Sequence, residues 1–291
     1  MLLPALLYFI IFRYGSMLGL LIAFQDYKPV LGQGFYETIF KGDWVGLKHF
    51  RFFFTSPNGL TVLSNTIIIS LYKLVFGFPA PILLALLLNE IKNERFKKGV
   101  QTISYLPHFM SWVILAGVLR VIFSPDYGAI LPLFDLFSIE PINFLGDDRY
   151  FRTLLILSDL WQNIGWDSVI YLAALSSLDL SLYEAARIDG ANRLQQLWYL
   201  TLPSIAGTIA IMFILRVGQI MNAGFDQVFN LYNAAVYSVG DIIDTFVYRQ
   251  GLQKAQFSYT TAVGFFKSLT GFILVLSSNS IAKKLGYDSV L

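Results

Sequence analysis

The chain has 291 residues, of which 56% are hydrophobic and only 14% are charged, and its formal net charge is +2. An ordinary soluble domain carries roughly a quarter charged residues, and a chain of this length still needs a polar surface around whatever it buries. The composition therefore indicates that lipid is part of its solvent. The nearly neutral charge gives no reason to expect a nucleic-acid partner. The absence of cysteine excludes thiolate ligands, and only His49 and His108 are available for a histidine metal site.

Six apolar stretches are long enough to cross a bilayer, which requires about 20 residues. We therefore predict an all-α integral membrane protein with six transmembrane helices in a single domain. Basic residues are denser in the shorter loops that follow spans two and four, which places those loops and both termini in the cytoplasm. The predicted spans cover about residues 2–24, 63–88, 100–123, 151–175, 203–222 and 259–282.

The sequence lacks the common catalytic and nucleotide-binding patterns. It contains no G-x-x-x-x-G-K-[S/T], no H-E-x-x-H and no G-x-S-x-G. We therefore expect no catalytic site, no metal site and no cofactor bound by this chain.

Ionisable side chains within the predicted spans are informative, because each one at the bilayer centre costs about 2.5 to 3.5 kcal/mol on insertion scales. The helices must turn such groups toward protein or water. Three of them, Lys73, Arg120 and Lys267, stand alone among apolar neighbours, and we expect them to snorkel or to form structural pairs. The full set is Arg13, Lys73, Arg120, Asp159, Asp167, Arg216 and Lys267.

Two polar stripes are candidates for a substrate pathway. Asp159, Asn163 and Trp166 follow one another at i, i+4 and i+7 in the fourth span, and Gln219 and Asn222 continue a stripe from Arg216 in the fifth. Amide and carboxylate groups beside an indole suit a sugar, whose hydroxyls take hydrogen bonds and whose C–H face packs on a ring. The alternative is that these residues only join helices by hydrogen bonds.

The loop between spans four and five predicts a helix–turn–helix. A helix over about 181–188 ends at the turn signal Asp189-Gly190. A second helix over about 191–200 has an apolar stripe that includes Leu197 and Trp198, which we expect to anchor it to the membrane domain. Pro203 suits the first turn of the next span.

This loop resembles the EAA loop of permease subunits of bacterial ABC importers, whose pattern is E-A-A, three residues, G, nine residues, then I-x-L-P. Here Glu184-Ala185-Ala186 precedes Gly190 and Leu200-Thr201-Leu202-Pro203 at that spacing, and Leu200 replaces the preferred Ile. Four longer stretches, which begin at Tyr105, Asp159, Phe229 and Thr261, are similar to maltose-type sugar permeases that import oligosaccharides and polysaccharide breakdown products.

The resemblance implies a type I ABC importer permease in the bacterial cytoplasmic (plasma) membrane, with a cytoplasmic coupling helix in the loop over residues 181–203. It implies a heterodimer with a second homologous permease, two ATPase subunits that hold ATP and magnesium, and an extracellular sugar-binding lipoprotein that delivers the sugar. This chain would then not be an enzyme. The residues implied in ATPase coupling are Glu184, Ala185, Ala186, Asp189, Gly190, Leu197 and Pro203, and the candidate substrate-pathway residues are Asp159, Asn163, Trp166, Gln219 and Asn222.

Two other classes of protein could also carry polar residues within membrane spans. A secondary transporter driven by an ion gradient would use Asp159 or Asp167 as a proton site, but it should show an inverted internal repeat, and none is visible. A membrane-embedded enzyme would need a converging catalytic set, which is also absent. The long segments 25–60, 124–150 and 223–258 are expected to lie outside the cell, where they could dock a binding protein.

Overall fold

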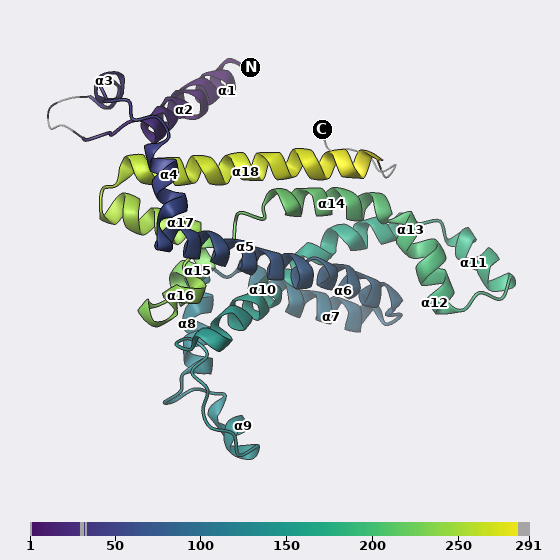
Figure 1. Cartoon of the computed structure of the whole chain (residues 1–291). Helices are drawn as coiled ribbons and strands as arrows, with labels where there is room; N and C mark the ends of the chain where they lie inside the picture. Colours follow the sequence, from purple (N-terminus) through teal and green to yellow (C-terminus); the bar gives the residue numbers. More distant parts are fainter. Residues whose placement is uncertain (1, 30–31, 33, 285–291) are drawn as a thin grey trace. The chain divides into compact units, whose positions relative to one another are not determined.

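The computed structural model describes residues 2–29, 32 and 34–284, and these are helical along most of their length (Figure 1). They contain no β-strand, only one isolated antiparallel bridge between Gln25 and Trp44. The predicted all-α class is therefore confirmed. The chain divides into two compact units, unit 1 within residues 1–66 and 241–270 and unit 2 within residues 67–240 and 271–291.

Unit 1 begins with a continuous helical run from Leu3 to Phe24, in which α, π and 3₁₀ geometry alternate. Its core is aromatic: the ring of Phe53 lies 6.0 Å from Phe266 and 6.5 Å from Tyr259. The elements of this unit are α1 (Leu3–Tyr8), η1 (Phe9–Tyr14), α2 (Gly15–Met17), η2 (Leu18–Phe24), α3 (Phe35–Phe40), α4 (Lys48–Thr55), α17 (Ile243–Val247), η6 (Tyr248–Gln253) and the first parts of α5 (Pro57–Gly77) and α18 (Phe257–Lys284).

Several charged groups in unit 1 form ion pairs. Lys267 Nζ lies 2.5 Å from Asp244 Oδ1, which confirms the expectation of a structural pair for that lysine. Asp26 contacts two basic residues of α4: Lys48 Nζ lies 2.5 Å from Asp26 Oδ2, and His49 Nε2 lies 3.0 Å from Asp26 Oδ1. The hydrogen bond from Lys48 lowers the pKa of Asp26.

Unit 2 is built around its longest helix, α10, against which α6 and α7 pack. The core at one end of this contact consists of Ile82, Ala85, Tyr171, Leu175 and Ile205. The elements are the second parts of α5 and α18 with α6 (Pro79–Glu90), α7 (Glu94–Tyr105), η3 (Leu106–Phe109), α8 (Trp112–Phe123), α9 (Leu131–Leu136), α10 (Asp148–Ser176), α11 (Leu180–Ile188), α12 (Arg193–Gln196), η4 (Leu197–Thr201), α13 (Leu202–Ser204), α14 (Ala206–Gly218), α15 (Phe225–Leu231), η5 (Ala234–Val236) and α16 (Tyr237–Gly240).

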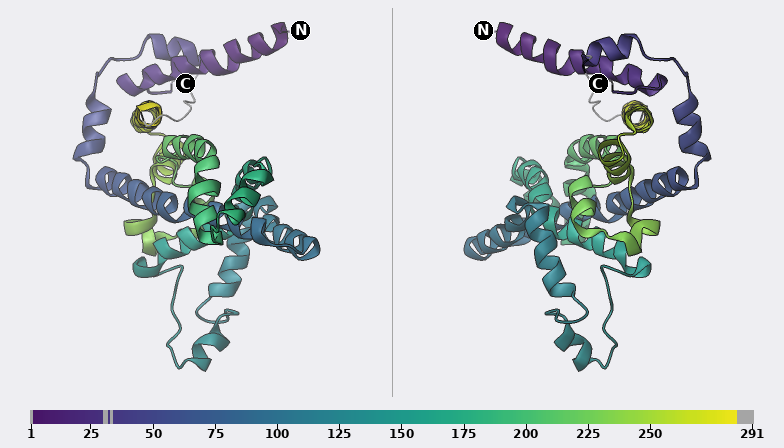
Figure 2. Two further views of the ribbon diagram at one scale, coloured as in Figure 1. Left: turned by 90° about the vertical axis from the view of Figure 1, so that its right-hand side faces the viewer. Right: turned by 90° about the vertical axis from the view of Figure 1, so that its left-hand side faces the viewer.

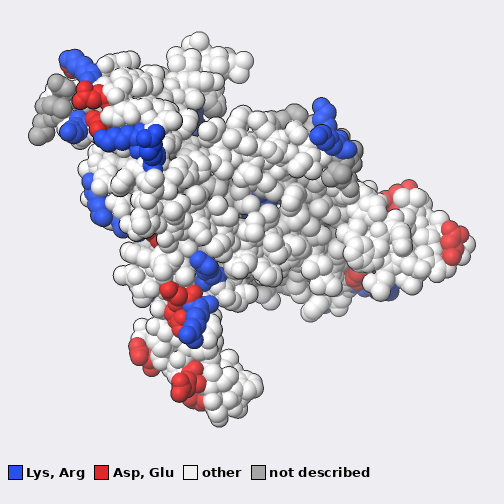
Figure 3. Space-filling view, in the orientation of Figure 1, with Lys and Arg blue, Asp and Glu red and all other residues white. Residues whose placement is uncertain are grey.

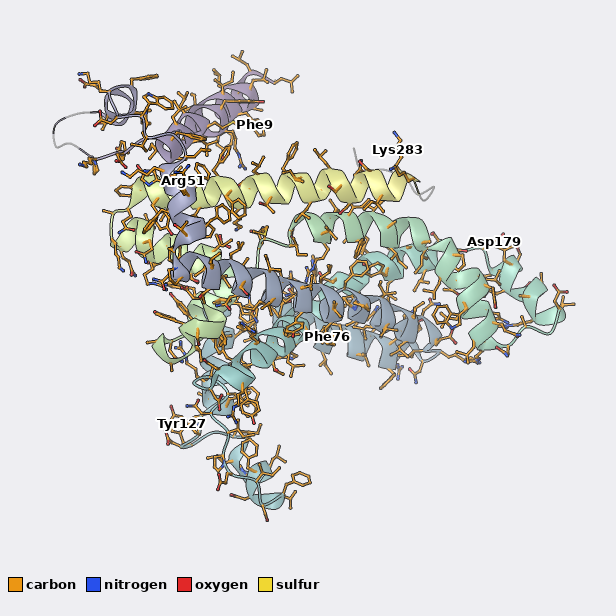
Figure 4. All side chains as sticks on the ribbon, in the orientation of Figure 1. Phe9, Arg51, Phe76, Tyr127, Asp179 and Lys283 are labelled. Carbon is orange, nitrogen blue, oxygen red and sulfur yellow. The ribbon has the colours of Figure 1, made fainter. Side chains whose placement is uncertain are left out.

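The segment between α8 and α10 extends away from the other helices of unit 2 (Figures 1 and 2). It consists of two loops that flank the short helix α9, and Tyr127 lies in the first of them (Figure 4). The segment is part of the predicted outer surface, 124–150.

Three helical stretches are long and apolar enough to cross a membrane: Leu3–Phe24, Pro57–Glu90 and Phe257–Lys284. Three further pairs of helices reach that length only if each bent pair is taken as one span. The number of spans is thus three to six by length and composition, and the six-span arrangement stays a prediction.

Two of the predicted spans are sharply bent. The stretch predicted over 100–123 is divided by a bend of 106° between η3 and α8. Pro107 has no N–H to continue the helical bonding, and the Ser111 hydroxyl accepts from the Ile114 N–H to start α8 anew. The stretch predicted over 203–222 bends by 61° near Ser204 and ends at Gly218.

Gly165 in α10 allows the closest approach of α7, and this contact yields a test of the packing in unit 2. A Cβ at this position would lie 2.2 Å from the carbonyl oxygen of Ser104, which is backbone and has no alternative rotamer. We expect Gly165→Ala to lower the thermal stability of the purified protein by about 2 kcal/mol or more, through overpacking. The matched control is Gly117→Ala in α8, where nothing lies within 4 Å. Equal unfolding temperatures for both variants would contradict this packing.

Candidate functional site

A polar cavity of about 160 Å³ lies within unit 2. Its lining comes from α5, α10, α14 and the segment that follows α14. Because these helices are otherwise rich in apolar residues, so many polar side chains in one place mark the cavity as the first candidate for function. The lining residues are Ser70, Lys73, Leu74, Asp159, Asn163, Asp167, Arg216, Gln219, Ile220, Asn222 and Gly224.

The Lys73 ammonium group is buried at the edge of this cavity and donates three hydrogen bonds. Its acceptors are Asp159 Oδ1 at 3.0 Å, the Ala223 carbonyl at 2.9 Å and Gln227 Oε1 at 2.5 Å. Arg216 approaches the other carboxylate oxygen of Asp159 at 3.9 Å, beyond hydrogen-bond distance. Lys73 thus forms a structural ion pair with Asp159, as predicted. Arg216 is held more weakly by Asp159 than Lys73 is.

The Lys73 interaction also explains why the fifth predicted span stops early. Residues 219–224 leave the helix after Gly218, and the Ala223 carbonyl, which has no helical partner there, accepts from Lys73. Gly224 has a φ of +96°, and a Cβ on it would lie 2.8 Å from Lys73 Nζ. A residue without a side chain is therefore required beside the ammonium group.

The structure brings four of the five predicted pathway residues to this cavity: Asp159, Asn163, Gln219 and Asn222. Trp166 is not among the lining residues. Its indole stacks on the His108 ring, with centroids 4.8 Å apart and planes 3° apart. His108 comes from η3, which packs on α10. The imidazole of His108 therefore covers the indole face that the helical spacing predicts to contact a ligand.

Two residues of α5 also line the cavity: Ser70, which is not among the predicted pathway residues, and Lys73, for which only a structural role is predicted. Their i, i+3 spacing places them on one face of α5 and is the sequence signal for this pair. The Ser70 hydroxyl oxygen is buried and has no hydrogen-bond partner among the described residues. An unpaired buried hydroxyl costs about 1 to 3 kcal/mol. Because Ser70 lines the cavity, a water molecule or a ligand hydroxyl entering there would satisfy it.

Arg120, the third isolated cation, is also structurally paired. It lies in α8 and donates to the carbonyl of Asn230 near the end of α15. This contact ties α8 to α15 at a distance from the cavity lining.

The segment predicted as a helix–turn–helix forms α11, then a turn, then the continuous α12, η4 and α13. Asp179 caps α11 by accepting from the Ser181 N–H, and this bond lowers the pKa of the aspartate (Figure 4). Gly190 has a φ of +82°, a conformation that a larger residue resists. The Tyr183 hydroxyl lies 3.0 Å from Thr201 Oγ1 and joins the two arms.

The outer side of this helix–turn–helix is exposed. Glu184, Ala185 and Asp189 are on the surface, and Ile188 is 87% exposed. The α11 end carries acidic side chains on a mostly uncharged surface (Figure 3). Between the arms lies a hollow of about 340 Å³, lined by Ala186, Asp189, Gly190, Ala191, Gln195, Gln196, Tyr199 and Leu200.

One prediction about the second arm is wrong. Trp198 is 64% exposed, so it does not anchor the arm to the described residues. Leu197 is half-buried, and the contacts of Tyr183 with Thr201 and of Gln196 with Ala191 stay within the helix–turn–helix. A polar contact to another helix comes from Arg193, which donates to Glu90 Oε2 of α6 at 3.1 Å. Pro203 lies in α13, just before the bend into α14.

Comparison with known proteins places this architecture. Residues 77–286, which include most of the cavity and the whole helix–turn–helix, match the family described as binding-protein-dependent transport system inner membrane component. The chain is 48% identical over 290 residues to the polygalacturonan/rhamnogalacturonan transport system permease protein YteP of Bacillus subtilis, covering all of this chain and 88% of that protein. It is 43% identical over 290 residues to protein LplB of the same organism, covering 89% of it.

A solved structure is similar over the whole chain. The crystal structure of a bacterial alginate ABC transporter, in complex with an alginate pentasaccharide-bound periplasmic protein, matches with a TM-score of 0.91 and 38% identity, covering 100% of this chain and 95% of that one. The chain therefore belongs to the binding-protein-dependent transport system inner membrane component family, the multi-pass membrane permeases of ABC transporters.

Proposed function

We propose that this chain is one permease subunit of an ABC importer that carries oligosaccharides or polysaccharide fragments across the bacterial cytoplasmic membrane. The observation that carries the proposal is the polar cavity in an apolar helical unit of this family. One relative supports the class of substrate, since its name refers to polygalacturonan and rhamnogalacturonan, and the solved neighbour is an alginate transporter. Membership of an ABC family speaks against the alternative of an ion-gradient-driven transporter.

The cavity chemistry suits a saccharide. Asn163, Gln219 and Asn222 offer amide donors and acceptors for hydroxyl groups. Arg216, which makes no close ion pair, offers a cation for a carboxylate. The neighbour whose crystal structure concerns the acidic polysaccharide alginate is consistent with such a role.

The observed cavity is small. Its volume of about 160 Å³ is below the roughly 300 to 1,000 Å³ of ordinary ligand pockets. An oligosaccharide can enter only after the lining helices separate. Transport by alternating access, in which rigid groups of helices rock apart, supplies that separation.

We assign coupling to the exposed loop over residues 181–203. Two partner ATPases, which hold ATP and magnesium, would bind this loop. The residues that contact them would be Glu184, Ala185, Ala186, Asp189 and Gly190. Leu197 and Pro203 would connect the loop to α14. Exposure of Glu184 and the positive φ of Gly190 support the assignment. A second permease would complete the pathway, and an extracellular binding protein would dock on the outer segments 25–60, 124–150 and 223–258. Both termini would be cytoplasmic.

The direct test of substrate class is transport. The permease would be reconstituted in proteoliposomes with its second permease, ATPases and binding protein, and uptake of labelled neutral and uronate-containing oligosaccharides would be compared. ATP-dependent uptake of either class supports the proposal. If neither oligosaccharide is taken up, and an ion gradient drives transport without ATP, the proposal is overturned.

The cavity makes a specific prediction about Gln219 and Asn222. Replacing either with Leu removes a hydrogen-bonding group from the lining, and we expect the maximal uptake rate to fall roughly twofold to tenfold. The control is Gln101→Leu, a change of the same kind in α7, away from the cavity. Uptake rates that are the same for all three variants would remove the cavity from the pathway.

The loop makes a second prediction. Gly190→Asp puts a side chain into left-handed backbone geometry, which costs an L-residue about 1 to 2 kcal/mol and Asp toward the low end of that range, or several-fold in a coupled equilibrium. We expect it to reduce ATPase activity stimulated by the loaded binding protein, and Glu184→Ala to reduce it as well. The controls are Gly99→Asp, where nothing lies within 4 Å, and Glu94→Ala, an exposed carboxylate in α7. Wild-type stimulation in both loop variants is the result that contradicts coupling.

A further inference from the structure

A line of contacts runs from the surface of unit 2 to the cavity. The half-exposed indole of Trp166 stacks on His108, and His108 Nδ1 lies 3.1 Å from Asn163 Oδ1. Asn163 Nδ2 in turn donates to the Asp159 carbonyl at 3.1 Å. Asn163 and Asp159 line the cavity, whereas His108 and Trp166 stand behind it.

The backbone on either side of His108 is fixed to α10. On the N-terminal side, Ser104 contacts Gly165 so closely that no Cβ fits between them. On the C-terminal side, Gln162 Nε2 donates to the Met110 carbonyl at 3.1 Å. Pro107, next to His108, is buried. The imidazole therefore has a defined place, and the stack on Trp166 defines its plane.

These contacts determine which atoms carry hydrogen. A backbone carbonyl only accepts, so the Asn163 atom that faces Asp159 must be the amide nitrogen. The amide oxygen then faces His108, and because that oxygen also only accepts, the proton between them belongs to His108 Nδ1. One amide N–H of Asn163 is not used by Asp159, and Asn163 lines the cavity.

We infer that His108 is a positioning residue that fixes the Asn163 amide so that it meets the cavity as a hydrogen-bond donor, with Trp166 holding the imidazole in plane. Without the proton on Nδ1, only the bond to the Asp159 carbonyl keeps the amide in this orientation. A donor at this point suits a hydroxyl or carboxylate oxygen of a saccharide. The inference rests on the proposed function, because it needs the cavity to take a sugar.

Two substitutions at one position separate the donor from the ring. His108→Asn keeps an N–H near the position of Nδ1 but loses the ring, whereas His108→Phe keeps the ring for Trp166 and loses the N–H. We expect His108→Phe to lower the maximal uptake rate of the reconstituted transporter roughly threefold to tenfold, and His108→Asn to retain at least half of it. A role in packing alone predicts the reverse order, and that order would refute the inference.

Assembly is checked by the yield and thermal stability of the complete complex. Should His108→Phe not assemble, His108→Gln replaces it, because its amide lies one bond farther from the backbone and misses the Nδ1 position. We expect the same loss for His108→Gln, and uptake at or above the His108→Asn level would overturn the inference.

A double-mutant cycle with Asn163→Leu tests whether His108 acts through Asn163. In the Asn163→Leu protein, His108→Phe should cause no further loss, since the amide it positions is gone. A loss of equal size in both backgrounds would show that His108 acts by itself, for example by touching the sugar, and would refute the inference. If Asn163→Leu alone leaves uptake unchanged, the proposed function of the cavity fails first and the role of His108 with it.

Discussion

The ammonium group of Lys73 is the constraint around which unit 2 is arranged. A lysine within an apolar span must find protein acceptors, because lipid offers none. Its three acceptors come from α10, from the unwound segment after α14 and from α15, namely Asp159, Ala223 and Gln227. Removing one partner of a buried ion pair typically costs about 3 to 5 kcal/mol. The three segments are thus held together by a single side chain.

This arrangement accounts for the shape of the cavity. Gln227 is itself fixed, since its amide donates to the Leu155 carbonyl and to Ser158 Oγ of α10. Lys73 and Gln227 hold the C-terminal end of segment 219–224, where the Ala223 carbonyl accepts from Lys73 and not from a helical N–H. Gln219 and Asn222 therefore lie on an irregular segment, and irregular backbone at membrane depth is tolerated where it lines a cavity. The polar lining and the helix break have the same cause.

Much of this site was predictable from the sequence, and the part that was not has a definite reason. The i, i+4 spacing placed Asp159 and Asn163 on one helix face, and the structure shows both in the cavity. The same spacing placed Trp166 there as well, and it failed because periodicity describes a helix in isolation. It does not reveal that η3 packs on that face of α10 and brings His108 against the indole.

The ends of helices likewise depend on contacts that local periodicity does not reveal. Hydropathy extended the fifth span to Asn222 because Ile220 and Met221 are apolar, yet α14 stops at Gly218. The acceptor that Lys73 needs lies about 150 residues away in sequence, and no local pattern records it. By contrast, the turn at Gly190 was predictable, since a glycine after a helix is a local signal and its φ is positive.

On the proposed mechanism, α14 is the part that links the loop to the cavity. It has 13 residues, or about 20 Å of helix, with a bend of 61° at the loop end and the Lys73-bound turn at the cavity end. A movement of α12 and α13 would therefore displace α14 as a rigid rod relative to the turn that Lys73 holds, and this displacement would change the cavity. Arg216 lies on that rod and Asp159 on α10, so their separation of 3.9 Å would change as the rod moves. The loosely held cation of the cavity is thus placed where movement of the loop can alter its surroundings.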